Sequence, residues 1–233
     1  IKKQFPAIAK ASTAAGADLQ ITAGVVQQAM NVWGDSLQSP EQAAALLTQS
    51  ANLSNASVES MQQALATLGP SAVNAGMSLS DTSTAVGLLT NTGTSSAEAA
   101  QQLRHALLQM QSPSKGAQAT MEQLGISYRD AQGNMKPFPQ ILSEVSNAMG
   151  GLSKADQDAA MKSLFHTSGM QAMRPLLKSI KDQSGDAKTS WSAYSDQMQK
   201  VGKNTQVANN FLNQQASDMQ NNLGSKIEQV GGN

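Results

Sequence analysis

The sequence predicts an all-α protein: a succession of short capped helices, one small β-hairpin near residues 124–138, and a longer C-terminal helix. Two observations support this fold class. Apolar residues recur every three to four positions through most of the chain, which is the spacing of one helix face. Serines precede many of these segments and glycines follow them, as is typical of helix N-caps and C-caps.

The N-terminal elements are expected to be helices that begin near residues 22, 39, 57, 80 and 95. Ser39, Pro40 and Gln42 form a complete start signal, with a serine cap, a proline at the first helical position and a glutamine three residues after the cap. Ser95 and Ser153 begin similar signals. The predicted stops are Gly34, Gly69–Pro70, Gly93, Gly150–Gly151 and Gly169. The starts are unevenly spaced, so the chain is a string of helix–turn–helix units rather than a regular repeat.

One segment departs from helical spacing. Residues 124–129 alternate, and Asp130–Asn134 has the composition of a turn in which Gly133 supplies a positive φ. Pro137 and Pro139 limit the second strand and then start the next helix. These features predict the hairpin near residues 124–138.

After Gly185 the apolar spacing lengthens into a pattern of alternating three- and four-residue steps. Its positions are Trp191, Tyr194, Met198, Val201, Thr205, Ala208, Leu212, Gln215, Met219 and Asn222. The polar members weaken a tight coiled-coil interpretation. Two interpretations stay open: a long helix that self-associates as a coiled coil, and an amphipathic helix that packs on its own chain.

The composition excludes several classes of function. The chain has no Cys, two His, and 16 basic against 16 acidic residues, which argues against disulfide scaffolds, thiolate metal sites and sequence-independent electrostatic binding of nucleic acid. No specific nucleic-acid site is expected. With 3% aromatic residues, any core is expected to be thin and built from Ala, Leu, Met and Val. No signal peptide or membrane-spanning helix is predicted, because the longest charge-free stretch, residues 60–80, is interrupted by polar residues and a proline.

Three short motifs resemble catalytic or binding sequences without completing them. Ser112–Lys115 matches S-x-x-K, but the S-D-N and K-T-G elements that accompany this nucleophile are absent, so a helix-capping turn is preferred. Asp130–Asn134 lacks the acidic ligands and the closing Glu of a calcium loop. Val201–Asn204 lacks the upstream glycine of a phosphate-binding loop.

The two histidines also fail to define a site. Glu98 and His105 lie two helical turns apart on one face, which supplies too few ligands for a metal, so a surface histidine is the preferred interpretation. His166 is expected at a helix C-terminus, near the negative end of the helix dipole. The sequence therefore predicts a protein that is not an enzyme, with no catalytic, cofactor-binding or metal-binding residues and no cofactor.

An ordered set of motifs resembles the core region of tail tape-measure proteins from long-tailed bacteriophages and prophages. The motifs are Gly69–Val73, Gly76–Thr82, Leu88–Gly93, Ser96–Ala100, Leu103–Arg104 with Ala106–Leu108, Ser112–Lys115, Leu124–Ser127 with Asp130–Asn134, and Gly150–Ser153. The resemblance is dense over about residues 55–180. Ala100, where the family usually has Gly, and Phe165–His166, where Phe-Gly is common, depart from the pattern without removing a catalytic group.

The resemblance implies a structural protein of the virion tail and a division of the chain into three parts. We expect upstream helices in residues 1–55, the tape-measure core with the hairpin in residues 56–184, and a long amphipathic helix in residues 185–233. Because the chain begins at Ile1 rather than Met and ends in Gly231–Asn233, we expect a fragment of a longer protein.

The family's role supplies further expectations. Such chains occupy the lumen of the tail tube, set tail length during assembly in the host cytoplasm, and are expelled to assist DNA delivery. The implied partners are the tail-tube protein, tail assembly chaperones, tail-tip or baseplate proteins, further copies of the chain in a homo-oligomer, and the host membrane on ejection. Two alternatives are a membrane-active helical module and a region flanking a cell-wall hydrolase domain.

Overall fold

Serine side chains begin most helices of the protein. In α3, α4, α5, α6, α7, α9 and α10 a serine hydroxyl accepts a hydrogen bond from a backbone N–H of the first turn. The computed structural model describes residues 5–231, which form eleven α-helices and no β-strand. They are α1 (Phe5–Ala15), α2 (Leu19–Trp33), α3 (Pro40–Leu53), α4 (Val58–Asn74), α5 (Leu79–Asn91), α6 (Ser96–Gln111), α7 (Lys115–Leu124), α8 (Phe138–Met149), α9 (Lys154–Lys181), α10 (Trp191–Gly202) and α11 (Thr205–Gly231). The predicted all-α class is confirmed.

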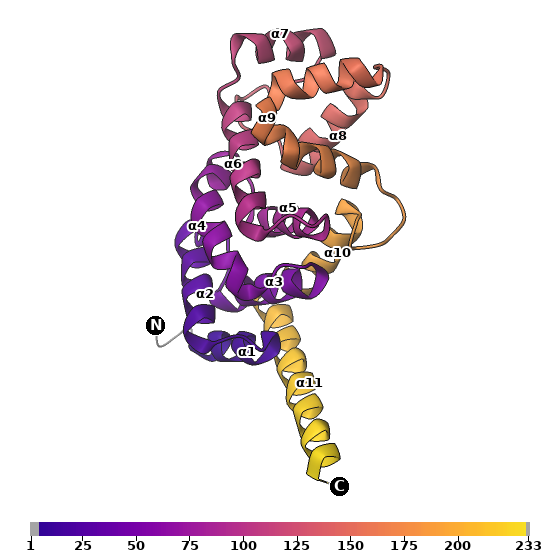
Figure 1. Cartoon of the computed structure of the whole chain (residues 1–233). Helices are drawn as coiled ribbons and strands as arrows, with labels where there is room; N and C mark the ends of the chain where they lie inside the picture. The colour runs from indigo at the N-terminus through magenta and orange to yellow at the C-terminus, as the bar shows by residue number, and fades with distance from the viewer. Residues whose placement is uncertain (1–4, 232–233) are drawn as a thin grey trace.

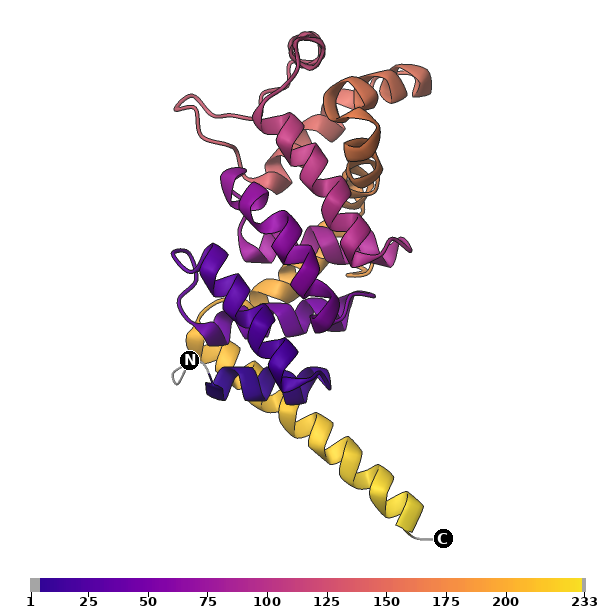
Figure 2. The same ribbon diagram turned by 60° about the vertical axis from the view of Figure 1, so that its left-hand side comes forward.

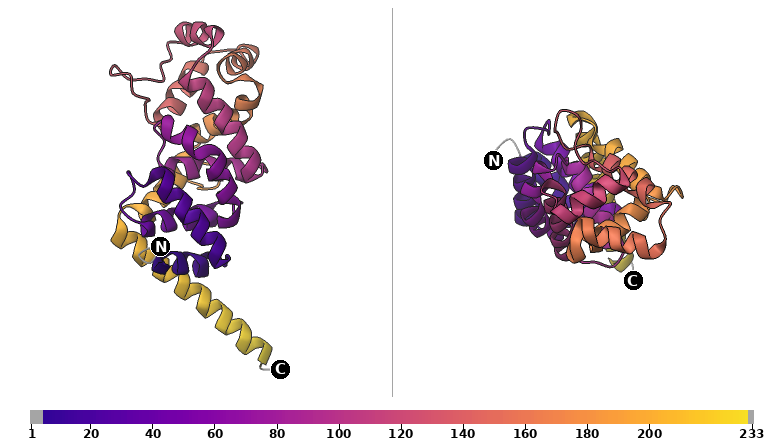
Figure 3. Two further views of the ribbon diagram at one scale, coloured as in Figure 1. Left: turned by 90° about the vertical axis from the view of Figure 1, so that its left-hand side faces the viewer. Right: turned by 90° about the horizontal axis from the view of Figure 1, so that it is seen from above.

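The helices stack into an elongated body from which α11 projects. Figure 1 shows α1–α3 at one end, α4–α6 and α10 in the middle, and α7–α9 at the other end. The chain returns through α10, which packs on α3, α5 and α9, and α11 then crosses α1 and α3. In Figure 2 and in the side view of Figure 3, the C-terminal part of α11 continues beyond the body.

Small residues allow the helices of the body to approach closely. A Cβ atom placed on Gly87 in α5 would overlap the Tyr194 hydroxyl, and one on Gly202 would overlap Leu46. One on Gly169 would lie 2.9 Å from the backbone of Ala106. The core contains many Ala, Leu, Met and Val residues, as predicted, together with six of the eight aromatic side chains.

The buried Tyr194 of α10 belongs to a hydrogen-bond network that joins α10, α3 and α5. The Tyr194 hydroxyl lies 2.6 Å from the Ser50 hydroxyl of α3 and donates to the Ser50 carbonyl at 3.1 Å. The Ser50 hydroxyl is in turn 3.2 Å from the Ser83 carbonyl of α5, to which it donates. Burial raises the pKa of Tyr194 to about 12, so the phenol keeps its proton for these bonds at neutral pH.

The predicted β-hairpin near residues 124–138 is wrong. The turn itself forms, with Gly133 at φ +84° and the Lys136 N–H donating to the Tyr128 carbonyl at 2.9 Å. Pairing ends after the single bridge between Arg129 and Met135, so residues 5–231 contain no strand. The prolines that follow have no N–H to extend a ladder, and side-chain bonds within the turn replace strand pairing.

Two of the predicted helix stops are also wrong. Gly69–Pro70 lies inside α4, where Gly69 packs against Val32 of α2 and Pro70 is exposed. Gly169 lies inside α9, pressed against α6. At both positions, the glycine serves close packing between helices rather than helix termination.

The predicted long C-terminal helix is divided. α10 ends at Gly202, and α11 starts at Thr205, with the Asn204 side chain accepting a hydrogen bond from the Val207 N–H. The apolar positions of α10 and of the first turns of α11 are buried against the same chain. The packing interpretation therefore holds for this part, whereas the end of α11 is exposed.

Candidate interaction surfaces

The serine and aspartate motifs found in the sequence have structural roles. Ser112 ends α6, and Ser114 caps α7 by accepting from the Ala117 N–H at 3.1 Å, which is the predicted capping turn. Lys115 is exposed. The Asp130 carboxylate accepts hydrogen bonds from two backbone N–H groups of its own turn. The Ser114 and Asp130 side chains of the two motifs are therefore hydrogen-bonded to backbone groups of their own turns.

The histidines lie apart from any cluster of ligands. Glu98 accepts a hydrogen bond from Gln102, and His105 is exposed on the same helix, α6. Within residues 5–231 no three His, Asp or Glu side chains are grouped so that they could hold a metal ion. His166 is exposed at a break in α9, where the first half of that helix ends.

The break at His166 bends α9 into two halves, residues 154–165 and 167–181. His166 has φ 58° and ψ 179°, a backbone conformation that residues other than glycine rarely adopt. Arg174 of the second half forms a 2.8 Å ion pair with Asp158 of the first half. In an unbroken helix these two residues would be about 24 Å apart along the axis. The bend therefore brings the two halves face to face.

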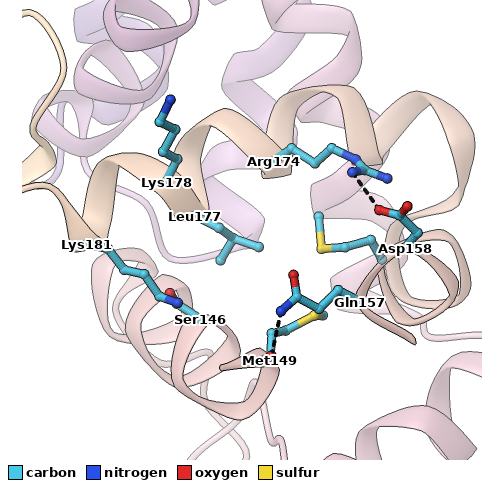
Figure 4. Close-up of a pocket in the computed structure, with 9 residues that line it drawn as sticks. Ser146, Met149, Gln157, Asp158, Arg174, Leu177, Lys178 and Lys181 are labelled. Atoms are coloured by element: carbon cyan, nitrogen blue, oxygen red, sulfur yellow. Dashed lines mark hydrogen bonds and ion pairs between the residues drawn. The ribbon is translucent and has the colours of Figure 1, made fainter. Parts of the chain in front are cut away.

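A pocket of about 240 Å³ lies inside this bend (Figure 4). α8 supplies Ser146 and Met149, and the two halves of α9 supply the other lining residues. Leu177 points into the space, and the Lys181 side chain extends toward Ser146. Gln157 closes one side by donating to the carbonyls of Met149 and Leu152 at 3.0 and 3.2 Å. We call this space the α8–α9 pocket.

The α8–α9 pocket is positively charged. Its lining holds three basic side chains, Arg174, Lys178 and Lys181, against one acidic side chain, Asp158. The only ion pair among these residues is the one between Arg174 and Asp158, and neither lysine forms an ion pair in the described part of the chain, although Asp182 lies near enough to Lys178 for their charges to interact. Of the remaining lining residues, Ser146 and Gln157 are polar and uncharged, and Met149, Met161 and Leu177 are apolar.

One polar atom of this pocket has no partner. The Ser146 residue is 3% exposed, and its hydroxyl forms no hydrogen bond. Buried hydroxyls nearly always have a partner, because losing water without replacement costs about 1–3 kcal/mol. Ser146 is thus available as a donor or acceptor for a group that enters the pocket.

A second, larger space is lined by residues of α3, α5 and α10, beside the contacts among these helices. This cleft has a volume of about 680 Å³, and its lining includes the charged residues Asp196, Lys200 and Lys203. The hydroxyl of Ser80 on α5 lines it and lacks a hydrogen-bond partner. Acidic and basic groups are more evenly balanced here than in the α8–α9 pocket.

The third surface is the projecting end of α11. Met219 contacts the body near Gly16, and all residues from 220 to 231 are exposed. Three large apolar side chains follow at helical spacing, Leu223, Ile227 and Val230, with exposed fractions of 54%, 72% and 81%. These residues extend the apolar stripe that includes the buried Leu212.

Comparison with known proteins identifies the family. The sequence profile of the family described as phage-related minor tail protein matches residues 1–166, more than two thirds of the chain. The chain belongs to the phage-related minor tail protein family. It is 28% identical over 157 residues to the tape measure protein of Pneumococcus phage Dp-1, an alignment that covers 67% of this chain and 12% of that protein. No solved structure matches the chain.

Membership of the minor tail protein family makes the chain a component of the phage tail. The family match ends at residue 166, where α9 bends, so it includes α8 and the first wall of the α8–α9 pocket but not Arg174, Lys178 or Lys181. None of the helices described in residues 5–231 has the length and apolar content needed to span a membrane.

Sequence reasoning did not find the pocket of this minor tail protein. A signal existed in the spacing of Arg174, Lys178 and Lys181, which places three basic side chains along one region of a helix. The bend at His166 that closes the pocket had no comparable signal, because histidine carries no preference for a positive φ strong enough to predict it.

Proposed function

We propose that this chain is a segment of a tape-measure protein that lies in the lumen of the tail tube, sets tail length during assembly and is expelled to assist DNA delivery. The similarity to the tape measure protein of phage Dp-1 supports this proposal. The chain spans about an eighth of that protein, so it would be one part of the ruler. In this proposal the segment acts structurally and catalyses no reaction.

The projecting end of α11 is the part best suited to a ruler. A helix that packs on nothing adds about 1.5 Å of length per residue, whereas residues inside the stacked body add little to its long dimension. Its apolar side chains Leu223, Ile227 and Val230 would face further copies of the chain in a homo-oligomer. The tube protein, tail chaperones and tail-tip or baseplate proteins are the other proposed partners.

Insertion mutants of the encoding phage test the length-setting role. Four heptads inserted after Gln220, in register with the α11 stripe, should lengthen the tail by about 42 Å, since 28 residues each add about 1.5 Å. Tail lengths are measured by electron microscopy of purified virions, and the mean over many particles is compared with that of the parent phage.

An insertion of the same length in the body provides the matched control. Twenty-eight flexible residues placed at Gly185, in the exposed turn between α9 and α10, leave the ends of those helices in contact and should not change tail length. Equal tails from the α11 insertion and the parent would contradict the ruler role of this helix. Equal lengthening by both insertions would show that total chain length, not α11, determines the tail.

A further inference from the structure

We propose that the α8–α9 pocket is a docking site for an acidic peptide of a protein partner, which inserts a carboxylate beside an aliphatic side chain. The proposal rests on the lining of the pocket and does not depend on the length-setting role.

The charge of the pocket selects an anion. Lys181 has no ion pair within residues 5–231, and its side chain extends toward the pocket wall that contains Ser146 (Figure 4). Arg174 adds positive charge from the opposite side but is partly neutralised by Asp158 at 2.8 Å. Lys178 points away from the centre of the pocket in the same view, so its contribution acts over a longer distance. Lys181 is therefore the main partner for an incoming carboxylate.

Ser146 gives the anion a second contact. Its hydroxyl is buried and has no hydrogen-bond partner, although it lies in the wall of a positively charged pocket. A carboxylate accepts hydrogen bonds in several directions, so one group can accept from an ammonium and a hydroxyl together.

The size of the pocket and its apolar surface indicate a peptide anchor. A space of about 240 Å³ is smaller than the roughly 300–1,000 Å³ of sites that enclose a whole ligand, and it suits one or two side chains. Met149, Met161 and Leu177 provide an apolar surface beside the charged groups. Methionine adapts to side chains of different shape, which favours an aliphatic neighbour of the carboxylate.

Titration with two matched peptides tests the site. The probes are the blocked pentapeptide Ala-Leu-Glu-Leu-Ala and its uncharged counterpart Ala-Leu-Gln-Leu-Ala. The readout is the NMR shift of the methionine methyl groups in the 233-residue chain, with the Met149 and Met161 signals assigned from M149L and M161L. The glutamate peptide should shift both signals, and the glutamine peptide should bind about tenfold more weakly or not at all.

Variants of the pocket locate the contacts. K181Q should weaken binding of the glutamate peptide by about tenfold, because it removes the charged donor. K162Q is the matched control, because Lys162 is an exposed lysine of α9 outside the pocket. S146A should weaken binding without lowering the thermal midpoint, since the hydroxyl it removes has no partner in the unbound protein. A merely structural role of Ser146 would instead lower the midpoint.

Several results would overturn the proposal. Equal binding of both peptides would mean that the charges are not used, and equal weakening by K181Q and K162Q would mean that the attraction is diffuse. A third result would assign the pocket to a lipid headgroup. In that case phosphatidylglycerol vesicles shift the Met149 signal, whereas neither the glutamate peptide nor phosphatidylcholine vesicles shift it. None of these results bears on the tail-length measurement, so the two proposals fail separately.

Discussion

The middle of the body and the free end of α11 are both helical, but they are held in opposite ways. In the body, glycines at 87, 169 and 202 bring helices into contact so close that no Cβ atom fits. At the end of α11, a Cβ atom placed on Gly224 would meet nothing within 4 Å beyond its chain neighbours and the backbone of its own helix, and large apolar side chains are exposed. A glycine substitution in the body therefore tests packing between helices, whereas one at the end of α11 tests only the local preference for helix.

The largest expected effect comes from filling the closest contact of the body. G87A places a methyl group on the Tyr194 hydroxyl and should break its bonds to Ser50. Overpacking together with the lost hydrogen bonds should lower the free energy of unfolding by about 3 kcal/mol. Urea denaturation followed by circular dichroism measures this loss.

G224A is the matched control for this substitution. Alanine is favoured over glycine in an exposed helix by about 1 kcal/mol locally, but this part of α11 can unfold without the body. Its urea midpoint should therefore equal that of the parent chain. A midpoint loss as large as that of G87A would mean that the end of α11 is packed in solution.

The second effect is a gain of stability at the bend of α9. His166 holds a backbone conformation that costs a residue with a side chain about 1–3 kcal/mol. H166G should remove most of that cost, and after the larger chain entropy of glycine is subtracted we expect a net gain of about 1 kcal/mol. Thermal denaturation of H166G against the parent chain provides the measurement.

The neighbouring substitution T167G distinguishes this conformational effect from a general effect of glycine. Thr167 is exposed and begins the second half of α9, so glycine there should destabilise the protein. If H166G also destabilises, α9 is not bent at this residue in solution, and the α8–α9 pocket would lose the geometry that joins Arg174 to Asp158.

The sequence predicted local structure better than it predicted contacts between distant segments. The caps at Ser39, Ser95 and Ser153 were found because a cap is specified by residues within one turn. Gly69 and Gly169 were misassigned as stops, because a glycine at a helix contact has the same local signature as a glycine at a helix end. The role of such a residue depends on a helix far away in the sequence.

The same limit applies to the candidate site. Arg174 and Lys181 could be placed on one helix from their spacing, but Ser146 and Asp158 join them only through the bend at His166. The hairpin prediction failed for a related reason, since the turn chemistry of Asp130–Asn134 was recognised but strand pairing needed more N–H donors than the following prolines leave.

A smaller, pH-dependent effect is expected at the ion pair that joins Lys136, just before α8, to Glu144 in the middle of that helix. Glu144 lies 2.8 Å from the Lys136 ammonium, and this hydrogen bond, with a second from Gln140, lowers the pKa of the carboxyl. A lowered folded-state pKa adds stability above the unfolded-state value, and this stability is lost as the pH falls through the folded-state value.

Because the Glu144 side chain is 37% exposed, the pair should contribute about 0.5 kcal/mol. E144Q should thus be less stable than the parent chain at pH 7 and equal to it at pH 2.5, by urea denaturation at both values. The exposed Glu59, which forms no ion pair in the described residues, gives the control E59Q. A deficit of E144Q that persists at pH 2.5 would assign its effect to packing rather than charge.

The smallest effect is expected from removing the free end of α11 altogether. Deletion of residues 221–233 removes only side chains that are exposed in the described part, residues 221–231, so the free energy of unfolding should change by less than about 0.5 kcal/mol. Helical circular dichroism should fall in proportion to the residues lost. On the packed half of the same helix, L212A should cost about 3 kcal/mol, because Leu212 is fully buried.

Protein concentration makes this last comparison decisive for the surface of α11. If a second copy covers Leu223, Ile227 and Val230, the thermal midpoint of the parent chain rises with concentration and that of the truncated chain does not. If both midpoints are independent of concentration and equal, the end of α11 is unpartnered in the isolated chain. Its apolar stripe would then require a different surface of the tail to cover it.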